Sequence, residues 1–160
     1  MNLSLVPIAM PADANVIIGQ SHFIKTVEDL YEIVVTSVPQ AAFAVAFNEA
    51  SGACLTRIDG NDDELRAAAA DAATAIAAGH TFVLFLRQAY PINVLNRIKD
   101  CPEVCRVFCA TANPLQVVVA ESEQGRGVLG VIDGAAPKGV EQEPDREWRV
   151  SLLRKIGYKR

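Results

Sequence analysis

The chain has 160 residues, 51% of them hydrophobic, which is enough for one domain spanning 1–160 to bury a core of its own. Its formal net charge of −4 argues against a protein that binds nucleic acid or an anionic membrane, because both contacts depend on clustered Lys and Arg. The predicted partner is therefore a small molecule or another subunit.

Targeting signals are not evident in the sequence. The first residues lack a basic segment followed by a long apolar run, and no stretch approaches the roughly 20 apolar residues of a membrane span. We therefore expect a cytoplasmic protein.

The four cysteines lie at positions 54, 101, 105 and 109. In such a chain we expect reduced thiols that pack as small hydrophobic side chains. A metal cluster of Cys101, Cys105 and Cys109 is rejected because the spacing matches no standard ligand pattern. We therefore expect no metal bound by these cysteines.

The first third of the chain alternates apolar strands with one helix. A first strand is expected within residues 1–14, and residues 15–19 form a second strand that ends at a glycine. A helix begins at Thr26, with a capping pattern formed with Asp29, and continues at helical spacing until Pro39. Further strands are predicted at 41–48 and 54–58.

An alanine-rich helix is expected next, over residues 62–78. Asn61 and Glu64 form its capping pattern, and Gly79 is predicted to take the left-handed position at its end. Later elements are a strand at 81–86, a short helix at 92–99 after Pro91, and a strand at 104–110.

Residues 108–134 contain two apolar strands joined by a glycine-rich polar turn, and 128–132 is the second of these strands. A loop at 133–144 leads to a last helix at 145–156, which has acidic residues at its start and basic residues near its end. Strands that alternate with helices and then follow one another predict an α/β fold, a three-layer α/β/α sandwich with a mixed sheet.

The loop before the first helix is a candidate anion site. Backbone N–H groups at a helix start attract negative charge, and His22, Lys25 and Thr26 lie at this point. His22 there would accept a phosphoryl group or act as an acid or base. The alternative is a capped helix with a solvated Lys and a structural His.

Two further candidates follow buried segments. His80 comes directly after the alanine-rich helix, where it either caps the last carbonyls or takes part in catalysis. Asn48 and Glu49 end a buried strand, where they either bind a ribose or base edge or only form a turn.

The turn at 121–127 is similar to a phosphate cradle. Gly125 and Gly127 supply accessible backbone N–H groups, and Arg126 supplies a fork of donors, although the pattern is not that of a P-loop. Asp133, after the next strand, is placed either to hold Mg²⁺ or to begin an Asp-Gly turn.

Taken together, these segments resemble the adenosine-specific kinase family nearly from end to end. The resemblance is carried by NVIIGQSHFIKTVEDLYE (15–32), AFNEASG (46–52), GHTFVLFL (79–86), YPINVLNRIK (90–99), PEVCRVFCATANP (102–114), ESEQGRGVLGVIDG (121–134), PKGVE (137–141) and LRKIGYK (153–159). It implies an α/β sandwich, a homo-oligomer such as a trimer, and a binding pocket for adenosine or AMP.

The resemblance also implies kinase chemistry through a phosphorylated histidine, but it does not identify the phosphoryl donor. If the donor is a nucleotide, we expect Mg²⁺ to accompany it. We predict that His22 carries phosphate, with His80 as the alternative acceptor. Charge on the phosphoryl group is neutralised by the residues already proposed as an anion site, Lys25, Thr26 and Arg126. The nucleoside is contacted by Asn48, Glu49 and Asn113. A non-catalytic adenosine or AMP sensor that acts through subunit contacts is the competing hypothesis.

Overall fold

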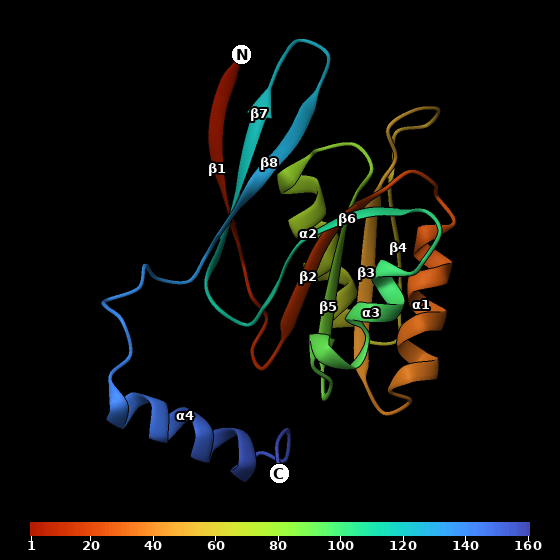
Figure 1. The fold of residues 1–160 in the computed structure, drawn as a ribbon. Coiled ribbons are helices and arrows are strands. Elements are labelled where there is room, and N and C mark those ends of the chain that lie inside the picture. Colours follow the sequence, from red (N-terminus) through yellow and green to blue (C-terminus); the bar gives the residue numbers. More distant parts are fainter.

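The computed structural model describes residues 1–160 as two β-sheets and four α-helices (Figure 1). The larger sheet has the strand order β4-β3-β5-β2-β6, and the smaller has the order β1-β7-β8. The strands are β1 (Asn2–Ile8), β2 (Asn15–Ser21), β3 (Ala42–Asn48), β4 (Thr56–Gly60), β5 (Thr81–Arg87), β6 (Val104–Thr111), β7 (Leu115–Glu121) and β8 (Arg126–Asp133). The helices are α1 (Thr26–Ser37), α2 (Asp63–Ile76), α3 (Leu95–Lys99) and α4 (Glu143–Lys155), and a 3₁₀ turn, η1 (Pro91–Asn93), precedes α3. None of the helices is both long and apolar enough to cross a membrane.

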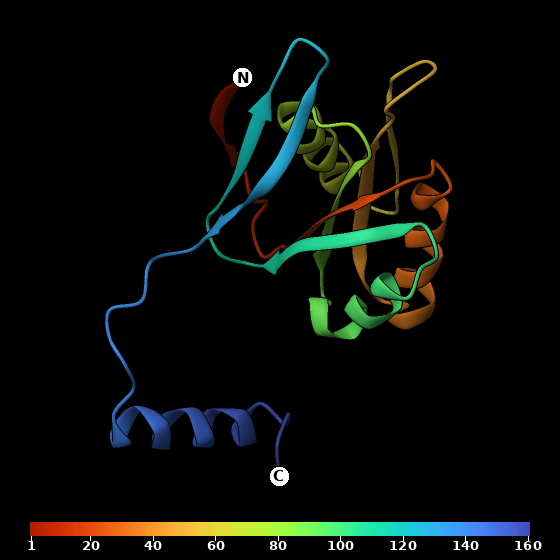
Figure 2. The same ribbon diagram turned by 45° about the horizontal axis from the view of Figure 1, so that its top comes forward.

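The five-stranded sheet is covered on both faces, as apolar β-branched strands require. On one face, α1 and α3 enclose a core of Leu and Phe side chains that includes Leu30, Phe43 and Phe82. On the other face, α2 and the three-stranded sheet share a second core (Figure 2). The alanines of α2 are buried there, since their small side chains allow the helix to approach the sheet closely. The predicted α/β class is confirmed.

The sheet is not mixed, however, because every ladder between named strands is antiparallel. The connection from β2 through α1 to β3 does run between strands of the same direction, as the alternating pattern predicted. β5 lies between these two strands and pairs antiparallel with both. The single parallel contact is an isolated bridge between Ala78 and Arg126.

Helix α2 is shorter at both ends than the sequence predicted. Asp62 caps it, accepting a hydrogen bond from the backbone N–H of Leu65 at 2.9 Å, whereas Asn61 bonds to the backbone of Phe43 and Ala41 instead. The helix ends at Ile76, and it is Ala77, not Gly79, that adopts the left-handed conformation.

Strand β2 continues past the glycine that was expected to end it. Its register with β6 shifts at Gly19, and the strand goes on to Ser21. A Cβ at Gly19 would lie 2.3 Å from Cζ of Phe82 and 2.6 Å from the carbonyl oxygen of Arg106. Glycine is needed at this position because a side chain and a backbone approach it together.

Helix α4 differs from the others because it does not pack on the body of its own chain. It follows an extended segment, 134–142, and stands apart from both sheets (Figures 1 and 2). None of its residues is buried. The predicted helix is confirmed, but none of its apolar side chains is fully buried.

Candidate functional site

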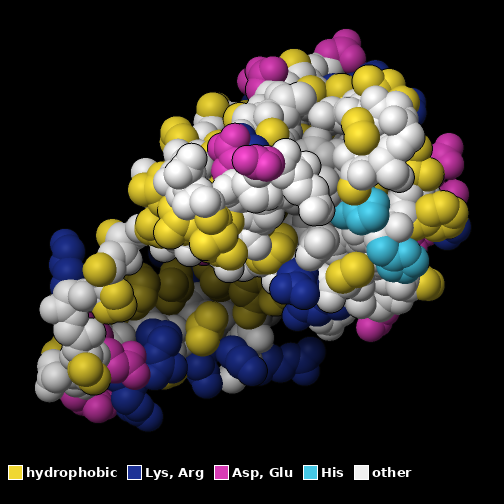
Figure 3. Space-filling view, turned by 90° about the horizontal axis from the view of Figure 1, so that it is seen from above, with side chains coloured by type: hydrophobic (Ala, Val, Ile, Leu, Met, Phe, Trp, Pro, Cys, Tyr) yellow, Lys and Arg dark blue, Asp and Glu magenta, His cyan; other side chains and the backbone are white.

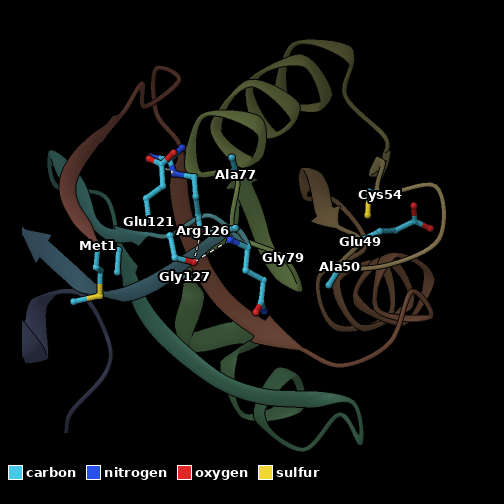
Figure 4. Close-up of a pocket in the computed structure, with 13 residues that line it drawn as sticks. Met1, Glu49, Ala50, Cys54, Ala77, Gly79, Glu121, Arg126 and Gly127 are labelled. Carbon is cyan, nitrogen blue, oxygen red and sulfur yellow. Dashed lines mark hydrogen bonds and ion pairs between the residues drawn. The ribbon is translucent and has the colours of Figure 1, made fainter.

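A cavity of about 600 Å³ lies between the two sheets. Its walls come from the β7–β8 hairpin, the loop after β3 and the turn after α2, and Figure 4 shows Arg126 and Gly127 across the opening from Glu49 and Cys54. The lining residues are Met1, Glu49, Ala50, Cys54, Ala77, Gly79, Ala120, Glu121, Ser122, Gln124, Gly125, Arg126 and Gly127. The structure thus brings together residues from three of the predicted segments.

Arg126 lies in the cavity wall with its guanidinium already engaged. Nη1 donates to the carbonyl oxygen of Ala75 at 3.1 Å, and Nη2 donates to Oγ of Ser4 at 3.2 Å. Nε lies 3.7 Å from the Glu121 carboxylate but is buried without a hydrogen-bond partner. Arg126 therefore links β8 to β1 and α2. Its Nε–H is the one of these donors that makes no hydrogen bond.

Glu49 is fixed on the opposite wall by its own loop. Oε2 accepts from the backbone N–H of Leu55 at 2.8 Å, and Oε1 accepts from Nη2 of Arg57 at 3.0 Å. The Leu55 N–H, with Arg57 as a smaller contribution, lowers the pKa of this carboxyl below its ordinary range. Glu49 is therefore held ionised and in a defined position, with acceptor capacity left for ligand hydroxyl groups.

Asn48 is placed differently from its neighbour, because its amide points into the fold. Nδ2 donates to the carbonyl oxygens of Ala73 and Ala78 at 2.8 and 3.1 Å, and Oδ1 accepts from the Thr56 hydroxyl at 2.8 Å. Each of these contacts joins β3 to the end of α2 or to β4. The amide thus positions the turn that lines the cavity.

The two histidines lie in an adjoining hollow of about 290 Å³. This hollow is lined by both rings and shares Glu49 and Ala50 with the main cavity. The His80 ring stacks on the Phe47 ring at a centroid distance of 5.9 Å. The backbone carbonyl oxygen of His80 accepts a hydrogen bond from the backbone N–H of Ser21 at 3.0 Å. That backbone contact brings the loop carrying His22 next to His80, as Figure 3 shows by the two adjacent histidines.

The start of α1 offers fewer free donors than the sequence suggested. The N–H groups of residues 26–29 are bonded to carbonyl oxygens of the preceding turn. Thr26 is fully buried, and its hydroxyl contacts Ser21 Oγ at 2.5 Å and the carbonyl of Phe23 at 2.6 Å. Lys25 pairs with Asp29, and this hydrogen bond raises the pKa of the ammonium group. The accessible positive charge at this point is Lys25, not the helix terminus.

Asp133 and Asn113 lie apart from the cavity. The Thr111 hydroxyl and the Asn113 amide both donate to Oδ1 of Asp133, at 2.7 and 3.1 Å. Arg126 and Asp133 stand at the two ends of β8, which at about 3.3 Å per residue separates them by roughly 23 Å. Neither Asp133 nor Asn113 lines the main cavity or the hollow that holds the two histidines.

Potential metal ligands gather at one place, which is not the rejected cysteine cluster. Asp29, Cys101 and Glu103 have ligand atoms within 4.8 Å of one another. Burial raises the pKa of the Cys101 thiol to about 12, and Lys25 already neutralises Asp29. A cation there would have to displace both the lysine and the thiol proton.

Two lining residues, Met1 and Ala77, had no signal in the sequence. Neither residue type carries chemistry that marks a site, and both reach the cavity only through the arrangement of the fold. Ser122 and Gln124 also line the cavity, and they belong to the turn at 121–127 that the sequence indicated.

The comparisons with known proteins agree with this architecture. A family described as "Adenosine specific kinase" matches residues 6–159. A solved structure, the crystal structure of the PH1918 protein from Pyrococcus horikoshii OT3, is 47% identical, with a TM-score of 0.95 over 99% of this chain and 98% of that one. No curated protein matches the chain.

Proposed function

The chain belongs to the adenosine-specific kinase family, and we propose that it binds adenosine or AMP in the cavity between its two sheets. The observation that supports this most directly is the cavity itself. Its volume of about 600 Å³ lies within the range of small-molecule sites, and the residues around it supply both charge signs.

We assign the sugar to the wall formed by Glu49. A carboxylate that is held ionised accepts hydrogen bonds from two neighbouring hydroxyl groups, which is the pattern a ribose presents. A phosphate of AMP then lies toward Gly125, Arg126 and Gly127, where the Nε–H of Arg126 makes no hydrogen bond and only a long ion pair with Glu121.

The phosphoryl-transfer step is assigned to the hollow that adjoins this cavity. An imidazole nitrogen of His22 attacks the terminal phosphorus of a nucleoside triphosphate, and the donor leaves as a diphosphate. The 5′-hydroxyl of adenosine then attacks the phosphohistidine, the P–N bond breaks, and the hydroxyl proton passes to the imidazole, which restores the histidine and yields AMP. Lys25 and Arg126 offset the negative charge, and His80 is the alternative phosphoryl acceptor. Mg²⁺ enters with the triphosphate.

A sensor without turnover is the second candidate, and one observation favours it. The guanidinium of Arg126 links β8 to Ser4 on β1 and to the carbonyl of Ala75 on α2. A phosphate that draws this group away loosens both links, so occupancy of the cavity changes the packing of the smaller sheet. We place either activity in a homo-oligomer, because α4 has no partner within its own chain.

Calorimetric titration with adenosine and AMP tests the binding site. Glu49→Ala should weaken both ligands, whereas Arg126→Lys should weaken AMP more than adenosine. Asp133→Asn is the matched control, and we expect it to bind both ligands like the unaltered protein. Equal loss for Asp133→Asn and Glu49→Ala would contradict the assignment to this cavity.

Labelled ATP separates the kinase from the sensor. The kinase predicts acid-labile label on the protein and labelled AMP when adenosine is added, with both lost in His22→Asn. Label that persists in His22→Asn and disappears in His80→Asn moves the role to His80. Binding without label or product supports the sensor.

A further inference from the structure

Three side chains that can bind a metal meet beside the start of α1. Asp29 lies in the first turn of α1, Cys101 in the turn after α3, and Glu103 directly before β6, and one ligand atom of each lies within 4.8 Å of the others. Figures 1 and 2 show α1, α3 and the start of β6 side by side. Asp29 and Cys101 are 72 residues apart in the sequence, so only the fold reveals this cluster.

Glu103 distinguishes this cluster from an ordinary acidic patch. It is only 3% exposed, and it is the only buried residue with a charged side chain. Its Oε1 is buried and makes no hydrogen bond, and its carboxylate takes part in none of the ion pairs of the chain. Because burying a carboxylate without a partner is costly, this side chain has unused capacity to bind a cation.

The thiol of Cys101 faces both carboxylates. Its Sγ lies 4.0 Å from Oδ2 of Asp29. Burial, with a smaller contribution from the Glu103 side chain, raises the pKa of the thiol to about 12, so the free thiol is neutral near pH 7. A metal ion that coordinates a thiol takes it as the thiolate and releases its proton to the solvent.

The kind and spacing of these ligands suit zinc. With Zn–S bonds of about 2.3 Å and Zn–O bonds of about 2.0 Å, a tetrahedral site holds sulfur and oxygen roughly 3.5 Å apart. The 4.0 Å between Cys101 and Asp29 therefore has to shorten by only about 0.5 Å. A thiolate beside two carboxylates favours Zn²⁺ over Mg²⁺ or Ca²⁺, which prefer oxygen ligands alone.

A way in from solvent is also present. A hollow of about 260 Å³ includes Asp29 and Cys101 in its lining, and it leaves room for a water molecule as a further ligand. The Lys25 ammonium group, which pairs with Asp29, belongs to a side chain that is 52% exposed. Lys25 can therefore turn into solvent when a cation takes its place beside Asp29.

We propose that Asp29, Cys101 and Glu103 bind one Zn²⁺, with water in the fourth position. This site is not the cluster of three cysteines that the sequence spacing excluded, because it uses only one of them. The hollow beside it shares no lining residue with the main cavity or with the hollow of the two histidines. The proposal is also independent of the proposed function, in which none of the three ligands has a role.

Calorimetric titration of the chelator-treated protein with ZnCl₂ tests the site and should give one Zn²⁺ per chain. Glu103→Gln and Cys101→Ser keep the side-chain shapes, and each should raise the dissociation constant for zinc at least about a hundredfold, since even losing an outer partner of a ligand costs about 10–100-fold. Cys105→Ser, which changes an exposed thiol on β6, is the matched control and should bind zinc normally. Lys25→Ala should bind zinc more tightly, because it removes the group that competes for Asp29.

Cobalt tests the ligands in the unaltered protein and so does not depend on how well a variant folds. The complex with Co²⁺ should show a thiolate-to-metal charge-transfer band in the near ultraviolet, and Cys101→Ser should lack it. Zn²⁺ should also raise the melting temperature of the unaltered protein but not that of Glu103→Gln. A cobalt complex without the thiolate band would overturn the proposal.

The two histidines are the competing zinc ligands, because they lie together in one hollow. His22→Asn and His80→Asn should leave zinc binding unchanged. Loss of zinc binding in either histidine variant, or its retention in Glu103→Gln, would place the metal elsewhere and refute this site. A folded protein that binds no zinc would refute it too, and would mean that Lys25 alone satisfies the cluster.

Discussion

Replacing Asn48 by alanine is expected to lower the free energy of unfolding by about 3 kcal/mol, because three hydrogen bonds are lost at about 1 kcal/mol each. The amide donates to two carbonyl oxygens near the end of α2 and accepts from Thr56. Asn48 is only 7% exposed, so water replaces these bonds poorly. At 2–4 °C per kcal/mol for a chain of this size, the melting temperature should fall by about 6–12 °C.

Denaturant titration measures this loss, and Thr56→Val provides a graded control. That variant removes only the bond from the Thr56 hydroxyl to Asn48 and should cost about 1 kcal/mol. Asn48→Asp should be worse than alanine, since a carboxylate would face two carbonyl oxygens without a proton to donate.

The result that would refute this reasoning is an Asn48→Ala variant with unchanged stability and strongly weakened adenosine binding. Asn48 would then contact the nucleoside, as the sequence alone suggested, and the three hydrogen bonds would contribute nothing net. Loss of stability with binding restored at low temperature would instead support the positioning role.

Three further outcomes are expected. Gly19→Ala should destabilise the fold by about 1–3 kcal/mol in a denaturant titration, because its Cβ would overlap the ring of Phe82. The pKa of Glu49 is lowered in the folded protein, so the ionised carboxylate stabilises the fold at pH values above its ordinary pKa of 4.5. This stabilisation is lost as the pH falls through the lower folded pKa. The difference in the free energy of unfolding between the unaltered protein and Glu49→Gln should therefore decrease as the pH falls through that range. Iodoacetamide at pH 8 should alkylate the exposed Cys54 well before Cys101, whose thiol has a pKa of about 12, as peptide mapping by mass spectrometry would show.

The order and type of the elements could be predicted because the local signals are strong. Apolar runs separated by Gly and Pro marked the strands, and helical spacing marked α1. A capping pattern with alanine-rich sequence marked α2, and the distribution of acidic and basic residues marked α4. The prediction of a mixed sheet was wrong, because local sequence signals do not show which strands pair with one another. The pairing of a strand depends on which segment enters beside it, and β5 comes between β2 and β3 from much later in the chain.

The composition of the site was predictable only in part. Glu49, Gly125, Arg126 and Gly127 were expected near a ligand and do line one cavity. Asp133 was proposed as a site residue because it follows a strand, but β8 is extended and puts Asp133 and Arg126 at opposite ends. Asn48 and Glu49 are neighbours whose side chains leave β3 in opposite directions, so one amide enters the fold while the next carboxylate reaches the cavity.

The glycines also could not be interpreted from the sequence alone, because glycine occurs at different positions for different structural reasons. A Cβ at Gly79 would lie 2.8 Å from that of Ala50, so glycine is required there by the fold itself. Gly125 has a φ of 159°, a backbone conformation that side-chain-bearing residues rarely adopt, so the turn itself favours glycine there. At Gly127 a Cβ would meet nothing within 4 Å, so the fold tolerates a side chain, which would only occupy part of the cavity. Packing therefore explains Gly79 and backbone conformation explains Gly125, so the close approach of a ligand is left as the reason for glycine only at Gly127.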